Sequence, residues 1–272
     1  MSAGQITRAA DEADLNEPAF PPRCPNRAEI AAHLYALFPP AFVHQCPDGT
    51  WIEIAFCRAG EDLNKAQPFS AFDLEEAAEF AEEKNRAGYN IYVGAALRHG
   101  KQRGRANGAN VLTASHAWAE FDNDDDAARI DAVLKEKNLL MAMTVVTGRT
   151  PHLRAHLYFE LAGRATPEEL KNANTALKTL LGSDDVQNPD RVMRLAGTIN
   201  YSSAKKIERG YAAELVTLHA AANSRRYDVD TLINLTKDEA DPYLELGKSF
   251  AHGGRSDDEL RALLEASRTA GN

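Results

Sequence analysis

The order of the predicted elements between residues 116 and 218 constrains the fold of this 272-residue chain most strongly. Alternating apolar side chains predict a strand over His116–Asp122, and apolar residues at helical spacing predict a helix over Asp126–Lys137. Two strands, a helix opened by a capping box and a last strand follow, with expected ranges Leu139–Val146, Leu153–Leu161, 166–182 and Tyr211–Leu218. The resulting β-α-β-β-α-β order is the ferredoxin-like arrangement, which indicates an α+β fold.

The first half of the chain predicts a separate α/β module. A helix from Asn26, a strand over Thr50–Cys57, a helix over Asp73–Arg86 and a strand over Asn90–Arg98 precede a polar loop. Residues 1–25 are small, acidic and proline-bearing, which is typical of a mobile arm. We therefore divide the chain into this arm, a domain over 26–222 with modules at 26–112 and 113–222, and a tail over 223–272.

The tail predicts a helix that follows a second capping box at Ser256–Glu259 and runs close to the last residue, Asn272. We interpret this abrupt end as a sign that a downstream domain is missing, so that the chain would be a fragment of a longer protein.

Composition excludes several classes of protein. Hydrophobic residues make up 44% and charged residues 26%, which is unlike a disordered or fibrous chain. The longest apolar stretch, residues 139–146, is too short to cross a bilayer, and the polar N-terminus lacks a signal-peptide pattern. Three cysteines without a CxxC pair indicate neither a disulfide scaffold nor a zinc site. We therefore expect a cytoplasmic protein without zinc.

Charge is segregated along the chain. The formal net charge of -9 argues against nucleic acid as a partner. Residues 84–119, 137–159 and 191–207 nevertheless hold six, three and four Lys or Arg residues and no acidic residue. Because an anionic partner responds to the local field rather than to the sum, these stretches suit a positive groove. They suit equally well basic loops scattered beside a solvated acidic surface.

Two acidic side chains fall on one face of a predicted strand. In the strand His116–Asp122, alternation places Trp118, Glu120 and Asp122 on one face and the small apolar residues on the other. Carboxylates at this spacing are close enough to share a pair of metal ions. The alternative is that they mark the solvent-exposed end of the strand.

The strand Leu153–Leu161 offers the opposite charge. Its alternation points Arg154, His156 and Tyr158 outward, on a sheet shared with the acidic strand. Carboxylates beside Arg and His suit a metal-bound polyphosphate, whereas the plainer interpretation is an exposed face with an ion pair or two. His152 and His156 do not suit one zinc ion, because residues four apart on a strand are separated by about 13 Å.

A third group of polar residues lies in a long predicted loop. Residues 184–206 contain three acids, then Arg191 and Arg194, a Gly-Thr turn and a pair of lysines. Loops of this length in compact domains are often functional, although a surface connection would look similar.

In this order, the three groups resemble the motifs of the archaeo-eukaryotic primase superfamily, in particular the RepB-like primase and primase-polymerase (prim-pol) branch of plasmids and phages. Glu120-Phe121-Asp122 resembles the acid-hydrophobic-acid motif I, and Arg154-Ala155-His156 resembles motif II. The run 194–200 with the lysines after it resembles the R-L-P-G-T-x-N sequence of motif III. The likeness spans roughly residues 50–217. Motif I begins here with Glu instead of Asp, and Ala196 replaces the usual proline.

The resemblance implies a nucleotidyltransferase, a DNA primase or DNA polymerase that makes primers for a mobile element. It implies an RRM-like catalytic module packed against the N-terminal module. Two Mg²⁺ or Mn²⁺ ions would be held by Glu120, Asp122 and Asp185, with Asp184 and Asp190 as alternatives to Asp185. The nucleotide-binding residues would be Arg154, His156, Arg194, Asn200 and Lys205.

The partners that the resemblance implies are a single-stranded DNA template, dNTPs or NTPs as substrates, and a replicative helicase or a fused helicase domain. We expect the basic loop residues to contact the template backbone; they are Arg98, Lys101, Arg103 and Arg105.

Two other functions would use the same residues. A metal-dependent nuclease would use the acids to activate water. A catalytically inactive RRM-like subunit would bind nucleic acid by stacking bases on Trp118 and Tyr158. Because Glu120 and Asp122 would repel phosphates without a metal ion, pure binding fits the sequence less well.

Overall fold

The computed structural model of the chain describes residues 24–124 and 126–236. The described residues up to Asn234 belong to one compact unit. The predicted N-terminal arm up to residue 23 and the tail beyond residue 236, with its second capping box, lie outside the described residues. Within the described ranges, no helix is long and apolar enough to cross a membrane.

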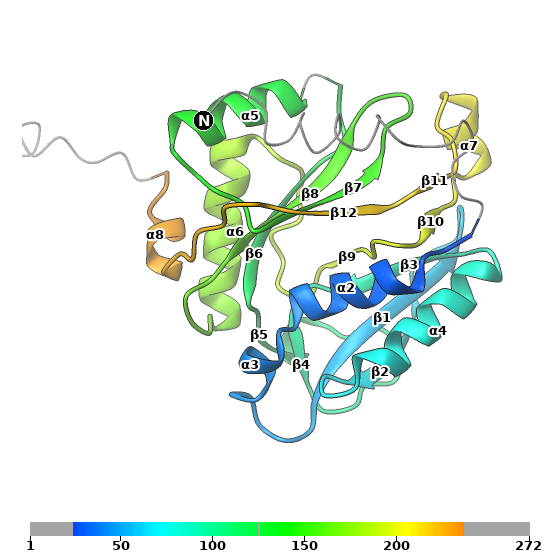
Figure 1. The fold of residues 1–272 in the computed structure, drawn as a ribbon, viewed down its shortest axis with the longest axis horizontal. Coiled ribbons are helices and arrows are strands. Elements are labelled where there is room, and N and C mark those ends of the chain that lie inside the picture. Colours follow the sequence, from blue (N-terminus) through cyan, green and yellow to red (C-terminus); the bar gives the residue numbers. More distant parts are fainter. Residues whose placement is uncertain (1–23, 125, 237–272) are drawn as a thin grey trace, which may run out of the picture. The chain divides into compact units, whose positions relative to one another are not determined.

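The first half of the chain forms most of a six-stranded antiparallel sheet (Figure 1). The strands follow the order β5-β4-β1-β3-β9, and β2 pairs with β1. Their bounds are β1 Thr50–Arg58, β2 Lys65–Ser70, β3 Tyr89–Gly94, β4 Leu97–His99, β5 Val111–Thr113 and β9 Val192–Arg194. The predicted strand Asn90–Arg98 is therefore two strands, and β2 and β5 were not predicted.

Two helices pack beside this sheet, and both were predicted. Helix α2 (Arg27–Leu37) is capped by Asn26, and helix α4 (Leu74–Arg86) is capped by Asp73, whose side chain accepts a hydrogen bond from the Glu76 amide. Helix α4 buries a stripe of Leu and Ala against β1, β2 and β3 and leaves its acidic face in solvent.

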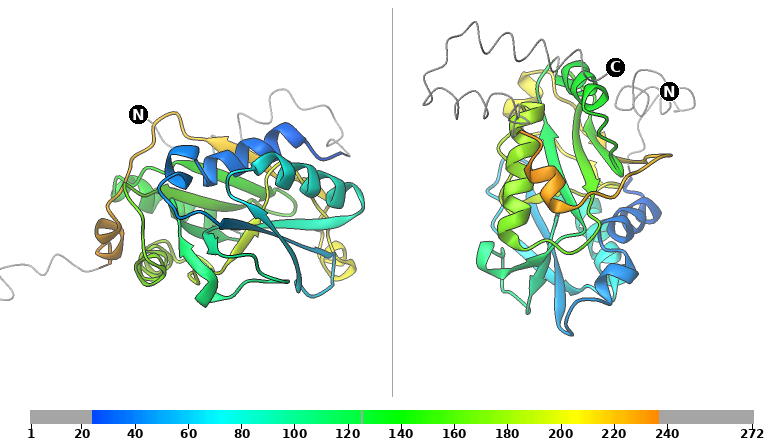
Figure 2. Two further views of the ribbon diagram at one scale, coloured as in Figure 1. Left: turned by 90° about the horizontal axis from the view of Figure 1, so that it is seen from below. Right: turned by 90° about the vertical axis from the view of Figure 1, so that its left-hand side faces the viewer.

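The second half forms a four-stranded sheet with the order β12-β7-β8-β6 (Figure 2). Its strands are β6 His116–Phe121, β7 Met143–Gly148, β8 Arg154–Glu160 and β12 Thr217–Ala220; the helices are α5 Asp126–Glu136 and α6 Pro167–Leu181. The predicted order is confirmed from β6 to α6, with β8 between β6 and β7, whereas further elements separate α6 from the fourth strand. The fourth strand lies beside β7, whereas a ferredoxin-like order has it beside the first strand.

Both faces of the four-stranded sheet are covered. Helix α6 packs against β6 on one side. On the other side, Tyr158 meets His33 of α2 edge-on at 5.9 Å, and the Trp118 indole N–H donates a hydrogen bond of 2.7 Å to the Val186 carbonyl. Trp118 and Tyr158 are fully buried, so the expectation of an outward face is wrong here and bases have no platform on which to stack.

The long loop predicted after residue 182 is largely structured. Strand β9 joins the N-terminal sheet, so the two predicted modules interleave. Strands β10 (Ile199–Asn200) and β11 (Glu214–Leu215) pair with each other and carry helix α7 (Ala204–Glu208) between them. The remaining described elements are α3 Pro40–Val43, the 3-10 turn Gly108–Asn110 and α8 Val229–Ile233, which packs on α6.

Candidate active site

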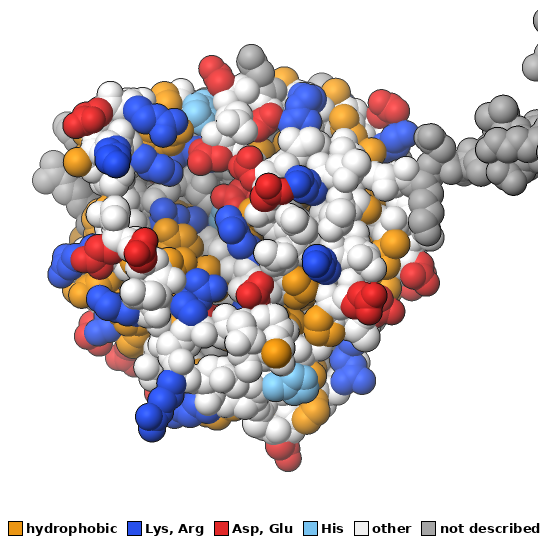
Figure 3. All heavy atoms as spheres, turned by 180° about the vertical axis from the view of Figure 1, so that it is seen from behind, with side chains coloured by type: hydrophobic (Ala, Val, Ile, Leu, Met, Phe, Trp, Pro, Cys, Tyr) orange, Lys and Arg blue, Asp and Glu red, His pale blue; other side chains and the backbone are white. Residues whose placement is uncertain are grey.

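A cleft of about 190 Å³ opens where the two sheets meet. Its walls include Glu120 of β6 and Asp122, which directly follows β6. The other polar walls are Arg154 and His156 of β8, Arg194 of β9 and Lys206 of α7. Figure 3 shows Lys and Arg side chains gathered around a hollow with acidic side chains at its edge. The structure therefore brings together residues from all three predicted motifs.

Glu120 has basic side chains on two sides. Its carboxylate lies 3.5 Å from His156 Nε2 and 3.6 Å from Arg191 Nη2, and His156 stands directly opposite it in the β6–β8 register. Burial raises the pKa of Glu120, but His156, Arg191 and Arg194 outweigh it and bring this pKa down to about 2. The Glu120 carboxylate that lines the cleft is therefore ionised at neutral pH.

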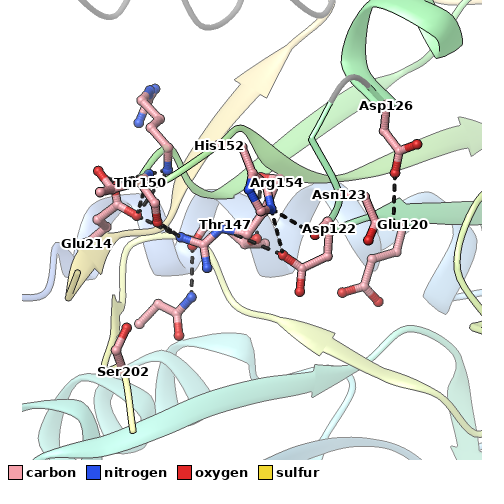
Figure 4. A network of polar contacts seen from close by, with 12 residues as sticks. Glu120, Asp122, Asn123, Asp126, Thr147, Thr150, His152, Arg154, Ser202 and Glu214 are labelled. Atoms are coloured by element: carbon pink, nitrogen blue, oxygen red, sulfur yellow. Dashed lines mark hydrogen bonds and ion pairs between the residues drawn. The ribbon is translucent and has the colours of Figure 1, made fainter. Parts of the chain in front are cut away.

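Asp122 has looser contacts. Its Oδ1 lies 3.8 Å from Arg154 Nε and 3.7 Å from His152 Nε2, distances that are too long for hydrogen bonds (Figure 4). This buried oxygen has no hydrogen-bond partner among the described residues. A buried carboxylate oxygen without a donor is poorly satisfied unless a ligand completes it.

The structure does not favour Asp185 as the third acid. Asp185 is exposed, forms an ion pair with Lys178 of α6 and does not line the cleft. Asp184 lies nearer to the other two acids, because its backbone amide donates to the Glu120 carbonyl at 2.9 Å, but it does not line the cleft either. Burial raises the pKa of Asp184, and the charges of Glu120 and Asp122 raise it further.

Asp190, the other alternative, acts through its backbone. Its carbonyl accepts weak hydrogen bonds from Arg98 at 3.4 Å and Arg105 at 3.5 Å. No contact of its carboxylate with Glu120 or Asp122 is present.

Arg154 is engaged by a second acid that the sequence did not reveal. Its Nη2 donates to Glu214 Oε2 at 2.8 Å and to the Thr150 carbonyl at 3.0 Å (Figure 4). The Glu214 carboxylate also accepts the amide of Arg149 at 3.0 Å. A side chain at Gly148 would overlap the Arg154 guanidinium, so the pair needs a glycine at that position. Arg154 thus lies against two carboxylates, those of Glu214 and Asp122, and also lines the cleft.

The basic side chains at the mouth of the cleft are Arg191, Arg194 and Lys206. Arg194 lies over the Tyr92 ring at 4.3 Å, and its buried Nη1 has no hydrogen-bond partner within the described ranges. Burial lowers the pKa of Lys206; Asp122 opposes this, whereas Arg194, Arg154 and Arg209 reinforce it. Such a group of cations suits an anionic ligand.

Two predicted nucleotide-binding residues have other surroundings. Lys205 is exposed on α7 and does not line the cleft, because the helix turns Lys206 inward instead. Asn200 does line the cleft, but its amide nitrogen donates to the Thr147 carbonyl at 2.9 Å.

Two of the four basic residues predicted to contact the template are paired with an acidic side chain of the protein instead. Arg98 is buried and its Nη2 lies 3.2 Å from Glu53 Oε2, while Arg105 Nε lies 2.6 Å from Glu53 Oε1. These two arginines form a structural ion cluster with Glu53, and the buried Arg98 is not available to phosphates, whereas the Arg105 side chain is 25% exposed. Lys101 and Arg103 remain exposed.

The carboxylates fit a hard divalent cation, although they do not form a complete metal cage. Among the residues that the structure describes, no group of three or more His, Cys, Asp and Glu side chains is arranged to hold a metal ion. Mg²⁺ is often bound by one or two carboxylates together with substrate phosphates and water. The unpartnered oxygen of Asp122 beside Glu120 fits that pattern.

Sequence reasoning assigned no individual role at the site to Tyr92, Arg191, Lys206 or Glu214; the first three line the cleft, and Glu214 pairs with Arg154. Arg191 follows the predicted residue Asp190, and Lys206 follows the predicted residue Lys205. In each pair, the direction in which the local backbone points the side chain decides which neighbour enters the cleft. Glu214 carries no local motif; its position opposite Asn200 in the β10–β11 pair reveals it.

Two solved structures share this architecture. The AEP domain of the cyanophage S-2L primase-polymerase (PrimPol) aligns with a TM-score of 0.55 and 20% identity, over 78% of this chain and 98% of that one. Primase RepB' aligns with a TM-score of 0.52 and 15% identity, over 89% of this chain and 69% of that one. No family profile matches the sequence, and no curated protein is significantly similar to it.

The chain therefore has a mixed α/β fold of the archaeo-eukaryotic primase type. Its fold is similar to that of a phage prim-pol domain and to that of primase RepB', the two kinds of protein that the motifs indicated.

Proposed function

We propose that this chain is a template-dependent DNA primase or primase-polymerase. The observation that supports the proposal is one cleft, on a primase-type fold, in which Glu120 and Asp122 face Arg191, Arg194 and Lys206. Two carboxylates opposite a group of cations suit a substrate that carries both a metal ion and a polyphosphate.

Each side chain has a role that follows from its surroundings. Glu120 and Asp122 would hold Mg²⁺ or Mn²⁺, and His156 keeps Glu120 ionised and oriented. Bound divalent ions supply a Lewis acid that lowers the pKa of a hydroxyl and neutralises a leaving pyrophosphate. Arg194 and Lys206 would bind phosphate oxygens, a role supported by their positions in the lining of the cleft that also contains the carboxylates.

The substrates would be nucleoside triphosphates and single-stranded DNA. Lys101 and Arg103 are exposed and stay candidates for template contacts. The buried positions of Trp118 and Tyr158 argue against a module that merely stacks bases.

The assay uses the full chain, an end-labelled primer on a single-stranded DNA template, Mg²⁺ or Mn²⁺, and dNTPs or NTPs in separate reactions. We expect template-directed lengthening of the primer. Asp122→Asn, which keeps the shape of the side chain but removes its charge, should abolish it.

Shortening of the labelled strand without nucleotides, abolished by the same substitution, would instead identify a metal-dependent nuclease. If neither product forms with any nucleotide set, the proposed function is wrong.

A further inference from the structure

The segment 199–215, made of β10, α7 and β11, projects from the cleft as a short arm. Figure 1 shows α7 at the periphery of the described unit, beyond the paired strands β10 and β11. Lys206 of α7 lines the cleft, so the arm is continuous with the candidate active site.

The base of the arm is fixed from two directions. Glu214 accepts hydrogen bonds from the amides of Arg149 and Thr150, at 3.0 and 3.1 Å, in the turn between β7 and β8. From the other sheet, the Asn90 side chain accepts the Tyr201 amide at 2.7 Å, and the Tyr201 hydroxyl donates to the Asn85 carbonyl at 3.0 Å. The arm is thus a defined structural element, and its tip has a fixed relation to the cleft.

The outer side of the arm combines positive charge with an exposed aliphatic side chain. Lys205 and Arg209 are exposed, and neither has an acidic partner within ion-pair distance among the described residues. Ile207 lies between them and is 60% exposed, the largest exposed fraction of any large hydrophobic side chain that the structure describes. An aliphatic side chain at this position can pack against an apolar surface that approaches the arm.

We infer that the outer side of this arm binds the single-stranded DNA that leaves the cleft. Lys205 and Arg209 would contact the phosphates, and Ile207 would pack against a base. This inference rests on the proposed function, because only a DNA template bound in the cleft would reach the outer side of the arm.

A nucleic-acid strand fits these features because it offers regular phosphate charges beside apolar base faces. Basic side chains supply the electrostatic attraction, and aliphatic side chains such as Ile are known to insert between bases. The arm holds three cations against two acidic residues, Glu208 and Glu214, and Glu214 at its base is paired with Arg154, so the outer side has a net positive charge. The pairing of Arg209 with the Tyr211 ring at 5.3 Å limits the freedom of its guanidinium without neutralising it.

The test measures binding of a fluorescein-labelled oligodeoxynucleotide to the full chain by anisotropy, without divalent metal and over a range of salt concentrations. The arm variant is Lys205→Ala/Arg209→Ala. The matched control is Lys171→Ala/Arg225→Ala, which removes the same two charges from exposed positions remote from the arm; Arg225 lies over the Tyr227 ring at 5.3 Å, as Arg209 does over Tyr211.

We expect the arm variant to lower the slope of log affinity against log salt by about 1.4, since each phosphate contact on a single strand contributes about 0.7. At about 0.1 M salt its affinity should fall about tenfold or more, while the control stays at the wild-type value. Ile207→Ser should weaken binding without changing the slope, because an apolar contact releases no counterions.

An arm variant with the affinity and slope of the wild type would overturn the inference, and so would an equal loss in the control. If the wild-type chain extends primers and the arm variant binds DNA normally, only this inference fails. If the wild-type chain neither binds the oligonucleotide nor extends primers, the proposed function fails with it.

Discussion

Glu120 and Asp122 are two residues apart on the chain, yet they have different surroundings. Glu120 is compensated by His156 and Arg191, whereas the buried Oδ1 of Asp122 has no hydrogen-bond partner among the described residues. Mutual repulsion between the two carboxylates therefore does not by itself describe the metal-free protein. Asp122 is the carboxylate with the most to gain from a bound cation.

The choice between neighbouring acids gives the first prediction. Asp184→Asn should lower primer extension roughly tenfold to 100-fold, as expected for a group that supports metal ligands. Asp185→Asn should leave the rate unchanged and alter the free energy of unfolding by less than about 1 kcal/mol, because an exposed ion pair contributes little. Steady-state incorporation and urea unfolding measure both. The reverse ranking would return Asp185 to the site.

Glu214 is expected to position Asp122 through Arg154. In Glu214→Gln the Arg154 guanidinium loses its counter-ion and is drawn towards Asp122, where it competes with a metal ion. The kcat for nucleotide incorporation should fall while the KM for the primer–template stays unchanged, and added Mn²⁺ should restore part of the rate.

Glu75→Gln, on the exposed face of α4 and outside both the cleft and the arm, is the matched control and should behave as the wild type. Equal effects of the two substitutions, or a change confined to the KM for primer–template, would mean that Glu214 only supports the arm.

At the scale of elements, one buried ion cluster joins segments that are distant in sequence. Glu53 of β1 pairs with Arg98 of β4 and with Arg105, and Arg98 also donates to the carbonyls of Pro189 and Asp190 just before β9. The cluster therefore helps to fix the segment that carries Arg191 and Arg194 into the cleft.

Arg98→Ala should lower the free energy of unfolding by about 3–5 kcal/mol, because it leaves the buried Glu53 carboxylate with one partner fewer. Arg103→Ala, in the same loop but exposed, should change it by less than about 0.5 kcal/mol. Urea unfolding followed by circular dichroism compares the two. Similar small effects would show that the cluster does not stabilise the fold.

Elements with strong local patterns were predictable from the sequence. The capping box of Thr166 and Glu169 and the stripe of leucines fixed helix α6, and alternation fixed β6 and β8. Short strands such as β2 and β9 were not, because partners far away in sequence determine them. For the same reason, the pairing of Arg98 and Arg105 with Glu53 was not predictable, since Glu53 lies 45 residues before Arg98 in the sequence.

On the scale of the whole unit, the outward face of the four-stranded sheet was predicted as exposed and is buried. Periodicity distinguishes the two faces of a strand but does not say whether a second layer covers each of them. The motif side chains Arg154 and His156 are therefore buried around the cleft, where sequence reasoning placed them on an open surface.

The buried layer between the sheets includes two neutral histidines. Burial lowers the pKa of His33 to about 3 and that of His116 to about 4, with the charge of His156 adding to the effect at His33. In the unfolded chain both protonate near pH ~6.5. The unfolded state thus binds more protons below that pH, and the free energy of unfolding falls as the pH is lowered.

Between pH about 6.5 and about 5, each histidine should contribute a slope approaching about 1.4 kcal/mol per pH unit. His33→Asn keeps an acceptor for the Ala196 amide, which donates to His33 Nδ1 at 3.0 Å. The substitution should remove the contribution of His33 to the pH dependence of the free energy of unfolding. Urea unfolding at several pH values measures it. An unchanged slope in this variant would show that His33 does not stay neutral in the folded protein.

Glu120 and Asp122 are proposed to form one site for a divalent ion together with a nucleotide. Thermal unfolding of the full chain with Mn²⁺ and a nucleoside triphosphate tests this most directly. At ligand concentrations about 100-fold above Kd, the wild type should gain roughly 5–10 °C in Tm. Asp185→Asn should keep this gain, and Glu120→Gln/Asp122→Asn should lose it while still unfolding cooperatively. A double variant that retains the full gain, or a wild type that shows none, would contradict the claim.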